Sequence, residues 1–215
     1  MSPLPPRTRI KICGLTREAD LDAAVEAGAD AVGFVLYPPS PRAVTVARAA
    51  ELARRVPPFV ARVGLFVNED AGAVERAARE AALDLLQFHG DESPEYCERF
   101  GLPYIKAVRV RPETDLLECA DRFRGARALL LDAWSEAWGG SGKRFDWSLI
   151  PPSLPMPLIL SGGLDPDNVA EAVRNIRPAA VDVSSGVESA KGIKDVARVA
   201  AFISGVEHGE ARSAG

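Results

Sequence analysis

The sequence has few of the residues that build disulfide frameworks or metal sites. It contains three cysteines and two histidines among 215 residues, and no Cys/His spacing resembles a zinc site. Because the cysteines are few and odd in number, we expect reduced thiols and a cytoplasmic protein. No apolar run reaches the roughly 18 residues of a membrane span. The Pro-rich segment 1–7 also lacks the apolar core of a signal peptide.

Positive charge is also scarce overall. The formal net charge is −4, which argues against a general binder of nucleic acid or of anionic membranes but leaves room for a local basic pocket. Hydrophobic residues make up 47% and charged residues 26%, the ordinary balance of a globular protein. No shift in composition marks a linker. We therefore expect one domain over 1–215, with flexible ends at 1–8 and 206–215.

What the chain does have is a regular alternation of strand and helix patterns. The expected strands are 9–13, 31–36, 59–67, 83–88, 103–108, 126–132, 157–160 and 180–183. The expected helices are 16–27, 45–55, 71–82, one from 93, 112–123, a short one from 145, one from 165, and 193–202. Eight such pairs predict an α/β fold, a single compact (β/α)8 TIM barrel. A doubly wound open sheet is the alternative.

Several helix starts carry their own signals. Thr16 and Thr45 stand where N-cap residues belong, and Ser93 precedes a proline at the first helical position. Asp165 and the proline after it predict the start of another helix.

Functional side chains of a barrel lie on the loops after its strands. Cys13 ends the first strand, Arg42 ends a Pro-rich loop, and His89 and Asp132 follow the fourth and sixth strand patterns. Each has a plain structural alternative: Cys13 as a small buried hydrophobe, Arg42 as a solvated loop residue, and His89 as a satisfied core group.

Glycine-rich loops follow the seventh and eighth strands. Gly162, Gly163, Ser184, Ser185 and Gly186 can turn backbone N–H groups toward an anion. Two such loops on adjacent strands favour phosphate binding over mere tight turns.

Strand phase indicates which side chains share a face. Lys11 shares one with Cys13, and Asp182 shares one with Ser184. Because the first and eighth strands become neighbours when a barrel closes, Asp182 is the expected partner of a buried Lys11. Gln87 shares the phase of His89, and we expect it either at the site or as a satisfied core group.

These residues resemble the phosphoribosylanthranilate isomerase family, a tryptophan-biosynthesis barrel. The similar stretches run in the family's order over nearly the whole chain; they are 11–16, 33–42, 63–68, 86–92, 130–132, 139–147, 162–163 and 182–188. Ser161 departs from the alanine expected before the two glycines, and 189–192 replaces a more usual Pro-Gly turn.

The resemblance implies an Amadori rearrangement of N-(5-phosphoribosyl)anthranilate without cofactor or metal. It assigns the general acid to Asp132 and the general base to Cys13, and Arg42 to the anthranilate carboxylate. A free aspartate, with a pKa of ~3.9, is ionised at neutral pH, so Asp132 must be protonated on binding. A free cysteine has a pKa of ~8.5, so Cys13 needs a positive neighbour to form its thiolate at neutral pH. We expect Gln87, His89, Gly162, Gly163, Asp182, Ser184, Ser185 and Gly186 to bind substrate.

Other functions remain open at this point. One alternative is the aminoaldose isomerase of histidine biosynthesis, or a barrel that acts on both substrates, but those sites use an aspartate where this chain has Cys13. Another is indole-glycerol-phosphate synthase, which needs a catalytic lysine–glutamate set and a longer N-terminus that this sequence does not show. A sugar-phosphate sensor would have no reason to keep Cys13 together with Asp132. We expect a phosphorylated aminosugar as the ligand, no nucleic-acid or membrane partner, and a monomer rather than a homodimer.

Overall fold

The computed structural model describes residues 7–134 and 144–211. Its strands are β1 Arg9–Cys13, β2 Ala31–Val35, β3 Ala61–Phe66, β4 Leu85–Phe88, β5 Tyr104–Val110, β6 Ala128–Ala133, β7 Leu158–Leu160, β8 Ala180–Val183, β9 Glu188–Ala190 and β10 Ile193–Lys194. Its helices are α1 Glu18–Glu26, α2 Val46–Ala53, α3 Ala71–Glu80, α4 Pro94–Glu98, α5 Leu116–Arg122, α6 Val169–Ile176 and α7 Val196–Ala211, with short 3-10 helices η1 Trp147–Leu149 and η2 Ser185–Val187.

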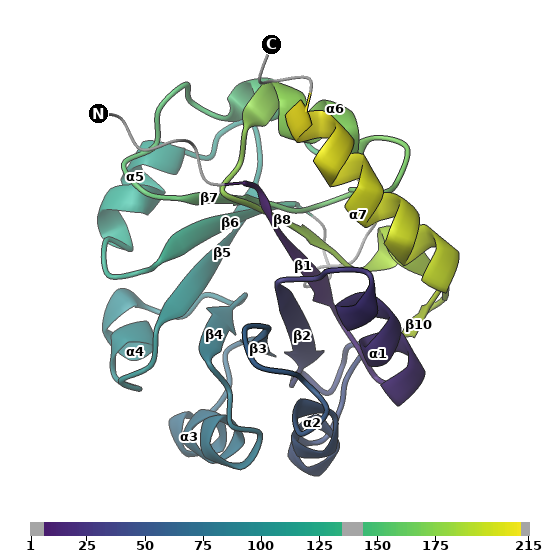
Figure 1. Cartoon of the computed structure of the whole chain (residues 1–215). Coiled ribbons are helices and arrows are strands. Elements are labelled where there is room, and N and C mark those ends of the chain that lie inside the picture. Colours follow the sequence, from purple (N-terminus) through teal and green to yellow (C-terminus); the bar gives the residue numbers. More distant parts are fainter. Residues whose placement is uncertain (1–6, 135–143, 212–215) are drawn as a thin grey trace.

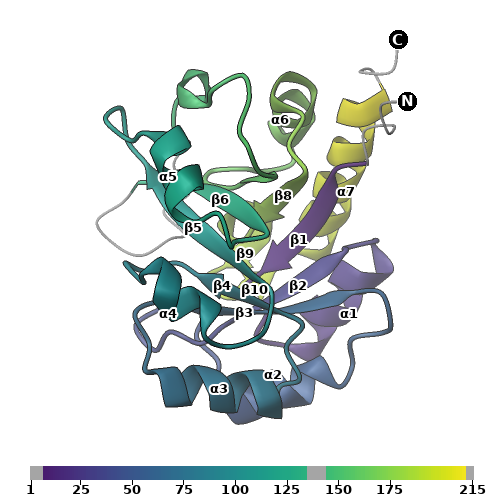
Figure 2. The same cartoon turned by 90° about the vertical axis from the view of Figure 1, so that its left-hand side faces the viewer.

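Strands β1 to β8 form a closed barrel in sequence order, and every neighbouring pair is parallel. The α-helices lie around the outside of the strands (Figures 1 and 2). The predicted (β/α)8 barrel is therefore confirmed, and because β8 pairs with β1, the open sheet is excluded.

The core of the described residues has three hydrophobic clusters. Inside the ring, Ile105, Ala107, Ala128, Leu130 and Ile159 form a small apolar cluster. A larger cluster fills the space between the strands and the surrounding helices. Strand β6 is buried at all six positions, as expected of a parallel strand covered on both faces. The third cluster, at the C-terminal ends of β1 to β3, consists of Cys13, Val35, Leu65 and Val67.

Two of the four helix starts predicted from the sequence, Thr45 and Ser93, are confirmed as side-chain caps. The Thr45 side chain accepts a hydrogen bond from the Arg48 amide, and the Ser93 side chain accepts one from the Tyr96 amide. The prediction for Thr16 is wrong, because α1 begins at Glu18 and its N-cap residue makes no side-chain cap bond. The Thr16 hydroxyl instead donates to the Gly192 carbonyl at 2.8 Å, tying the loop after β1 to the β9–β10 hairpin.

Other boundaries differ from the sequence expectation. Helix α6 begins at Val169 rather than at Asp165, whose carboxylate accepts backbone hydrogen bonds in the turn before it. Phe59 lies outside β3, fully exposed and with a positive φ.

The end of the chain also differs. Residues 193–194 form a strand, and α7 continues to Ala211, so the expected fraying from Val206 is wrong for 206–211. The reason is packing: Val206 is buried, and a Cβ at Gly209 would meet Val173 of α6. At the other end, Thr8 is buried and its hydroxyl donates to the Pro178 carbonyl, so the expected flexibility of 1–8 does not extend to Thr8.

An ion pair crosses the seam where the barrel closes. Lys11 on β1 and Asp182 on β8 are register partners, and their Nζ and Oδ1 atoms lie 2.8 Å apart with both side chains buried. The Ser161 hydroxyl donates to the other carboxylate oxygen at 3.3 Å. The pairing predicted from strand phase is confirmed.

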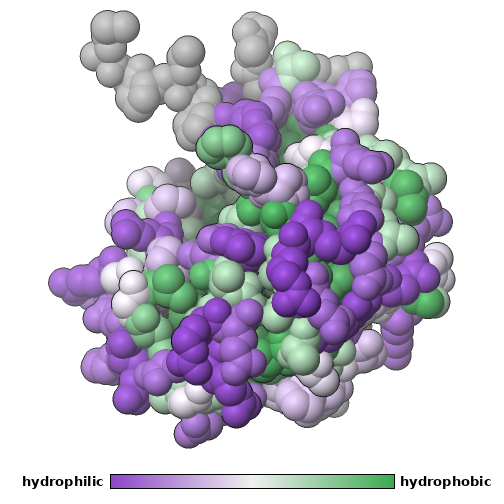
Figure 3. All heavy atoms as spheres, turned by 60° about the horizontal axis from the view of Figure 1, so that its bottom comes forward, coloured by the Kyte–Doolittle hydropathy of each residue, from purple (hydrophilic) through white to green (hydrophobic). Residues whose placement is uncertain are grey.

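The outer surface is mixed in character. On the face that Figure 3 shows, hydrophilic residues surround smaller groups of hydrophobic ones. Within the described ranges, no helix is both long enough and apolar enough to cross a membrane.

The buried seam generates a stability prediction. Lys11→Met leaves the Asp182 carboxylate buried without its partner, so it should lower the free energy of unfolding by ~3–5 kcal/mol in urea titrations. The matched control is Arg124→Met, which removes an equally short but exposed pair with Asp121 and should change stability by less than ~1 kcal/mol. If Lys11→Met and Arg124→Met have the same free energy of unfolding, the buried Lys11–Asp182 pair contributes no more to stability than an exposed pair does.

Candidate active site

Cys13 ends β1 at the C-terminal mouth of the barrel. Its side chain is buried, and its register partner on β2 is Gly33. A Cβ added at Gly33 would lie 2.8 Å from the Cys13 sulfur and 3.1 Å from the Lys11 nitrogen. Because Gly33 has no side chain, there is room beside it for both the thiol and the ammonium. Any larger residue at this position would displace one of them.

Burial raises the pKa of the Cys13 thiol, and the positive charge of Lys11 opposes that rise without cancelling it. Burial also acts to lower the pKa of Lys11, but the Asp182 carboxylate outweighs it and holds the Lys11 pKa above its ordinary value. The ligand-free site therefore contains a neutral thiol beside a firmly charged ammonium.

Arg42, from the loop after β2, is buried rather than solvated. Its Nε and Nη2 atoms donate to the two carboxylate oxygens of Glu188 on β9 at 2.7 and 2.8 Å. The bland interpretation of Arg42 as a loop residue in water is therefore wrong. The bidentate pair fixes the plane of the guanidinium, as such pairs do.

Lys194 on β10 completes this group of charges. Its Nζ donates to Glu188 Oε1 at 2.9 Å, to the Ser184 carbonyl at 3.0 Å and to the Ser184 hydroxyl at 3.3 Å, and its side chain is 1% exposed. Burial acts to raise the pKa of Glu188, but Arg42 and Lys194 hold it below its ordinary value. Neither Glu188 nor Lys194 was assigned a role from the sequence.

Asp132, near the end of β6, faces a second group of polar side chains. Its Oδ1 accepts a hydrogen bond from the Ala133 amide at 2.8 Å. His89 Nε2 lies 3.2 Å from Asp132 Oδ2 but makes no aligned hydrogen bond, and His89 Nδ1 lies 3.1 Å from Gln87 Nε2. All three side chains are buried. The structure thus brings Gln87 and His89 to the expected acid.

A buried ion pair supports the loop that carries His89. Lys106 Nζ lies 2.8 Å from Glu92 Oε2 and donates to the Gly90 carbonyl at 2.6 Å. Glu92 also accepts hydrogen bonds from the amides of Asn68 and Gly90. This pair, missed in the sequence, fixes the backbone directly after His89.

The two glycine-rich loops pack against one another. Gly162 and Gly163 both have positive φ, and a Cβ at Gly162 would meet Asp132 Oδ1 at 2.8 Å. A Cβ at Gly186, in η2, would lie 1.8 Å from the Leu164 carbonyl oxygen. Glycine is needed at 162 and 186 because backbone approaches backbone there. Phosphate binding at these loops remains a prediction.

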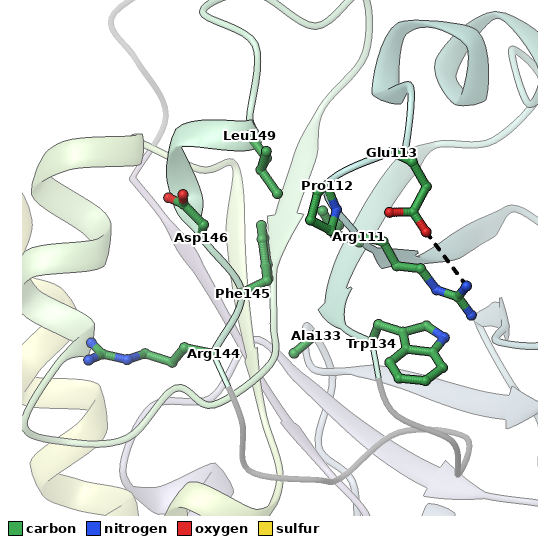
Figure 4. Close-up of a pocket in the computed structure, with 10 residues that line it drawn as sticks. Arg111, Pro112, Glu113, Ala133, Trp134, Arg144, Phe145, Asp146 and Leu149 are labelled. Atoms are coloured by element: carbon green, nitrogen blue, oxygen red, sulfur yellow. Dashed lines mark ion pairs between the residues drawn. The ribbon is translucent and has the colours of Figure 1, made fainter.

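A cavity of about 470 Å³ opens beside this site at the ends of β5 and β6. Figure 4 shows Phe145, Leu149 and Pro112 around it, with the Arg111 guanidinium beside the Trp134 ring. That cation lies 4.2 Å from the ring centroid. Ala133 also lines the cavity, so the cavity lies next to Asp132. Cys13 is not part of the cavity wall.

The expected site residues therefore fall into two groups. One group lies around the adjacent strands β8, β1 and β2 and consists of Cys13, Lys11, Asp182, Arg42 and Ser184. The other group, Asp132 and His89, lies across the mouth on β6 and just after β4. Part of the 139–147 stretch that carried the resemblance lies outside the described residues. Among those that are described, no cluster of three or more His, Cys, Asp or Glu side chains could hold a metal ion.

A buried thiol and a buried carboxylate can exchange protons with a small molecule held between them, and the basic groups beside them suit an anion. This fold and site define a class of protein: a (β/α)8 barrel that carries out acid–base chemistry on an anionic small molecule at the C-terminal ends of its strands.

Comparison with known proteins gives the family. The family model "N-(5'phosphoribosyl)anthranilate (PRA) isomerase" matches residues 10–205. The N-(5'-phosphoribosyl)anthranilate isomerase of Dechloromonas aromatica (strain RCB) is 62% identical over 200 residues, covering 93% of this chain and 96% of the relative. That of Methylibium petroleiphilum is 61% identical over 210 residues, covering 97% and 98%. The chain belongs to the phosphoribosylanthranilate isomerase family.

Solved structures agree. The crystal structure of phosphoribosyl anthranilate isomerase from Thermotoga maritima has a TM-score of 0.86 and 45% identity, covering 93% of this chain and 98% of that one. Another isomerase structure, solved with reduced 1-(o-carboxyphenylamino)-1-deoxyribulose 5-phosphate, has a TM-score of 0.83 and 42% identity at the same coverage.

The raised thiol pKa generates a prediction for the free protein. Because thiolate is the reactive form, the rate of Cys13 alkylation by iodoacetamide should rise with pH and reach half its maximum above the ordinary ~8.5. Mass spectrometry of the Cys13 peptide measures it. Lys11→Met removes the opposing positive charge, so its midpoint should be higher still. A midpoint below the ordinary value, or a lower one in Lys11→Met, would contradict this account of the thiol.

Proposed function

We propose that the chain isomerises N-(5-phosphoribosyl)anthranilate to 1-(2-carboxyphenylamino)-1-deoxy-D-ribulose 5-phosphate, a step of tryptophan biosynthesis, by acid–base catalysis with its own side chains. The single observation that carries the proposal is the placement of two buried proton-exchanging groups at one barrel mouth: Cys13 beside Lys11, and Asp132 beside His89. Membership of the isomerase family fits the same reaction.

Asp132 acts as the general acid in this proposal. Protonation of the furanose ring oxygen breaks its bond to C1 and leaves an open-chain Schiff base. The Ala133 amide donates to one oxygen of this carboxyl group, and His89 Nε2 lies 3.2 Å from the other. Substrate anions nearby favour the protonated carboxyl group that the step needs.

Cys13 acts as the general base. It removes the proton from C2 of the sugar, and the resulting enolamine tautomerises to the ketone. The Schiff base formed by ring opening is positively charged when protonated, so it favours the thiolate of a nearby cysteine. Lys11 adds to this effect, and its firm pairing with Asp182 keeps it from acting as the base itself.

The remaining groups bind the two ends of the substrate. Arg42 holds the anthranilate carboxylate, and the glycine-rich loops with Ser184, Ser185 and Gly186 hold the phosphate. Glu188 accepts one hydrogen from Arg42 Nε and one from Nη2, which leaves the two Nη1 hydrogens and the second Nη2 hydrogen for the substrate. Gln87 acts on the substrate through His89, since the two side chains contact one another.

Two further properties stand as proposals. We propose a cytoplasmic location, which suits a protein whose three cysteines are all free. We also keep the monomer as a proposal, although an isomerase from Thermotoga maritima, 41% identical and with a TM-score of 0.83, is described as dimeric.

The division of roles is tested by turnover. Cys13→Ser replaces the thiol by a hydroxyl that hardly ionises near neutral pH, and Asp132→Asn removes the acidic proton while keeping size. Each should lower kcat by ~10²-fold or more. The double variant should be little worse than the poorer single one, because the two groups act at successive steps and the slower step limits the rate, so the effects do not add. The change in anthranilate fluorescence during turnover measures the rate.

Binding of a product analogue serves as the control for folding in all three variants. If Cys13→Ser turns over at a near wild-type rate while binding the analogue normally, Cys13 is not the base and the proposed mechanism is wrong.

A further inference from the structure

The β9–β10 hairpin places one buried ammonium between two parts of the site. Glu188 and Lys194 are register partners across the hairpin, and their side chains form a 2.9 Å ion pair. The hairpin itself is tied to the loop and helix behind Cys13, because the Lys194 amide donates to Asp20 of α1 and the Thr16 hydroxyl donates to the Gly192 carbonyl. These ties fix the position of the Lys194 side chain relative to Cys13.

All three donor hydrogens of the Lys194 ammonium have a partner. One goes to the Glu188 carboxylate, and two go to the carbonyl and hydroxyl oxygens of Ser184. Since an ammonium has three donors, the group is saturated and cannot itself bind a ligand in this arrangement. Its contacts instead orient other groups.

The contact with Glu188 reaches the carboxylate end of the site. Glu188 Oε1 accepts from both Lys194 Nζ and Arg42 Nε. The ammonium therefore fixes the carboxylate that in turn fixes the guanidinium. Gly14 adds steric restraint, because a Cβ there would lie 2.6 Å from Arg42 Cδ.

The contact with Ser184 reaches the phosphate end. Because the Ser184 hydroxyl oxygen accepts from Lys194, its hydrogen is directed away from the ammonium and is available to an acceptor. Gly14 lies between the two ends, since its Cβ would also be 3.0 Å from Ser184 Oγ.

The charges of this cluster do not balance. Lys11, Arg42 and Lys194 are basic, and Asp182 and Glu188 are acidic, all within one buried connected region. With Cys13 as a neutral thiol, one positive charge is left over. An anionic ligand at the mouth offsets that excess.

Resting on the proposed function, we propose that Lys194 is a positioning residue that couples the two anion-binding ends of the substrate site, orienting Arg42 for the carboxylate through Glu188 and Ser184 for the phosphate directly. Removing this one ammonium should therefore weaken two unrelated fragments at once.

The experiment measures the affinities of inorganic phosphate and of anthranilate, each alone, by NMR titration of the full chain. Lys194→Met should weaken both by about tenfold or more, the factor for losing a hydrogen bond to a charged group. Ser184→Ala should weaken phosphate alone, and Arg42→Lys should weaken anthranilate alone. The control is Arg62→Met, which breaks an ion pair with Asp84 near the starts of β3 and β4, away from the C-terminal mouth, and should leave both affinities unchanged.

Glu188→Gln keeps the size of the side chain but removes the carboxylate between Lys194 and Arg42. It should weaken anthranilate and spare phosphate, and it tests the coupling even if Lys194→Met does not fold. The proposal is overturned if Lys194→Met binds both fragments like the wild type or like Arg62→Met, or if it weakens the binding of one fragment alone. Fragment binding needs no turnover, so failure of the wild type to isomerise its substrate would contradict the proposed function separately.

Discussion

The buried Lys11–Asp182 pair at the seam is the constraint on which the site depends. Two charges inside a barrel are tolerable only as a close pair, so the pair specifies how β1 meets β8. That register places Cys13 at the mouth and brings Ser184, two residues beyond Asp182, beside the loop after β1. Gly33 then leaves room for the thiol next to the ammonium. One ion pair thus relates closure of the fold to the geometry around Cys13.

From this seam the charges extend outward in a connected series. A second buried group lies near Cys13 and consists of Arg42, Glu188 and Lys194. The β9–β10 hairpin carries two of these residues, Glu188 and Lys194. Asp132 lies in a different group with His89. The separation suits two proton transfers on different atoms of one substrate, as the proposed mechanism requires.

The barrel and the strand-borne part of the site were predictable, because the period of a buried strand fixes which residues reach its end. Cys13, Asp132 and the Lys11–Asp182 pair followed from that period. Lys194 did not, because the sequence pattern placed it at the start of a helix, whereas a hairpin turn at Gly192 puts it in β10. The bidentate Arg42–Glu188 contact likewise joins residues far apart in sequence, and nothing local specifies their approach.

The central claim is that Cys13 removes the proton from C2 of the sugar and that Asp132 acts earlier, at ring opening. The most direct test is the kinetic isotope effect with substrate deuterated at C2. We expect a larger isotope effect in Cys13→Ser than in the wild type, because breaking the C–H bond then limits the rate. In Asp132→Asn the effect should not increase, since ring opening becomes slower instead. An enlarged effect in Asp132→Asn with none in Cys13→Ser would contradict the assignment.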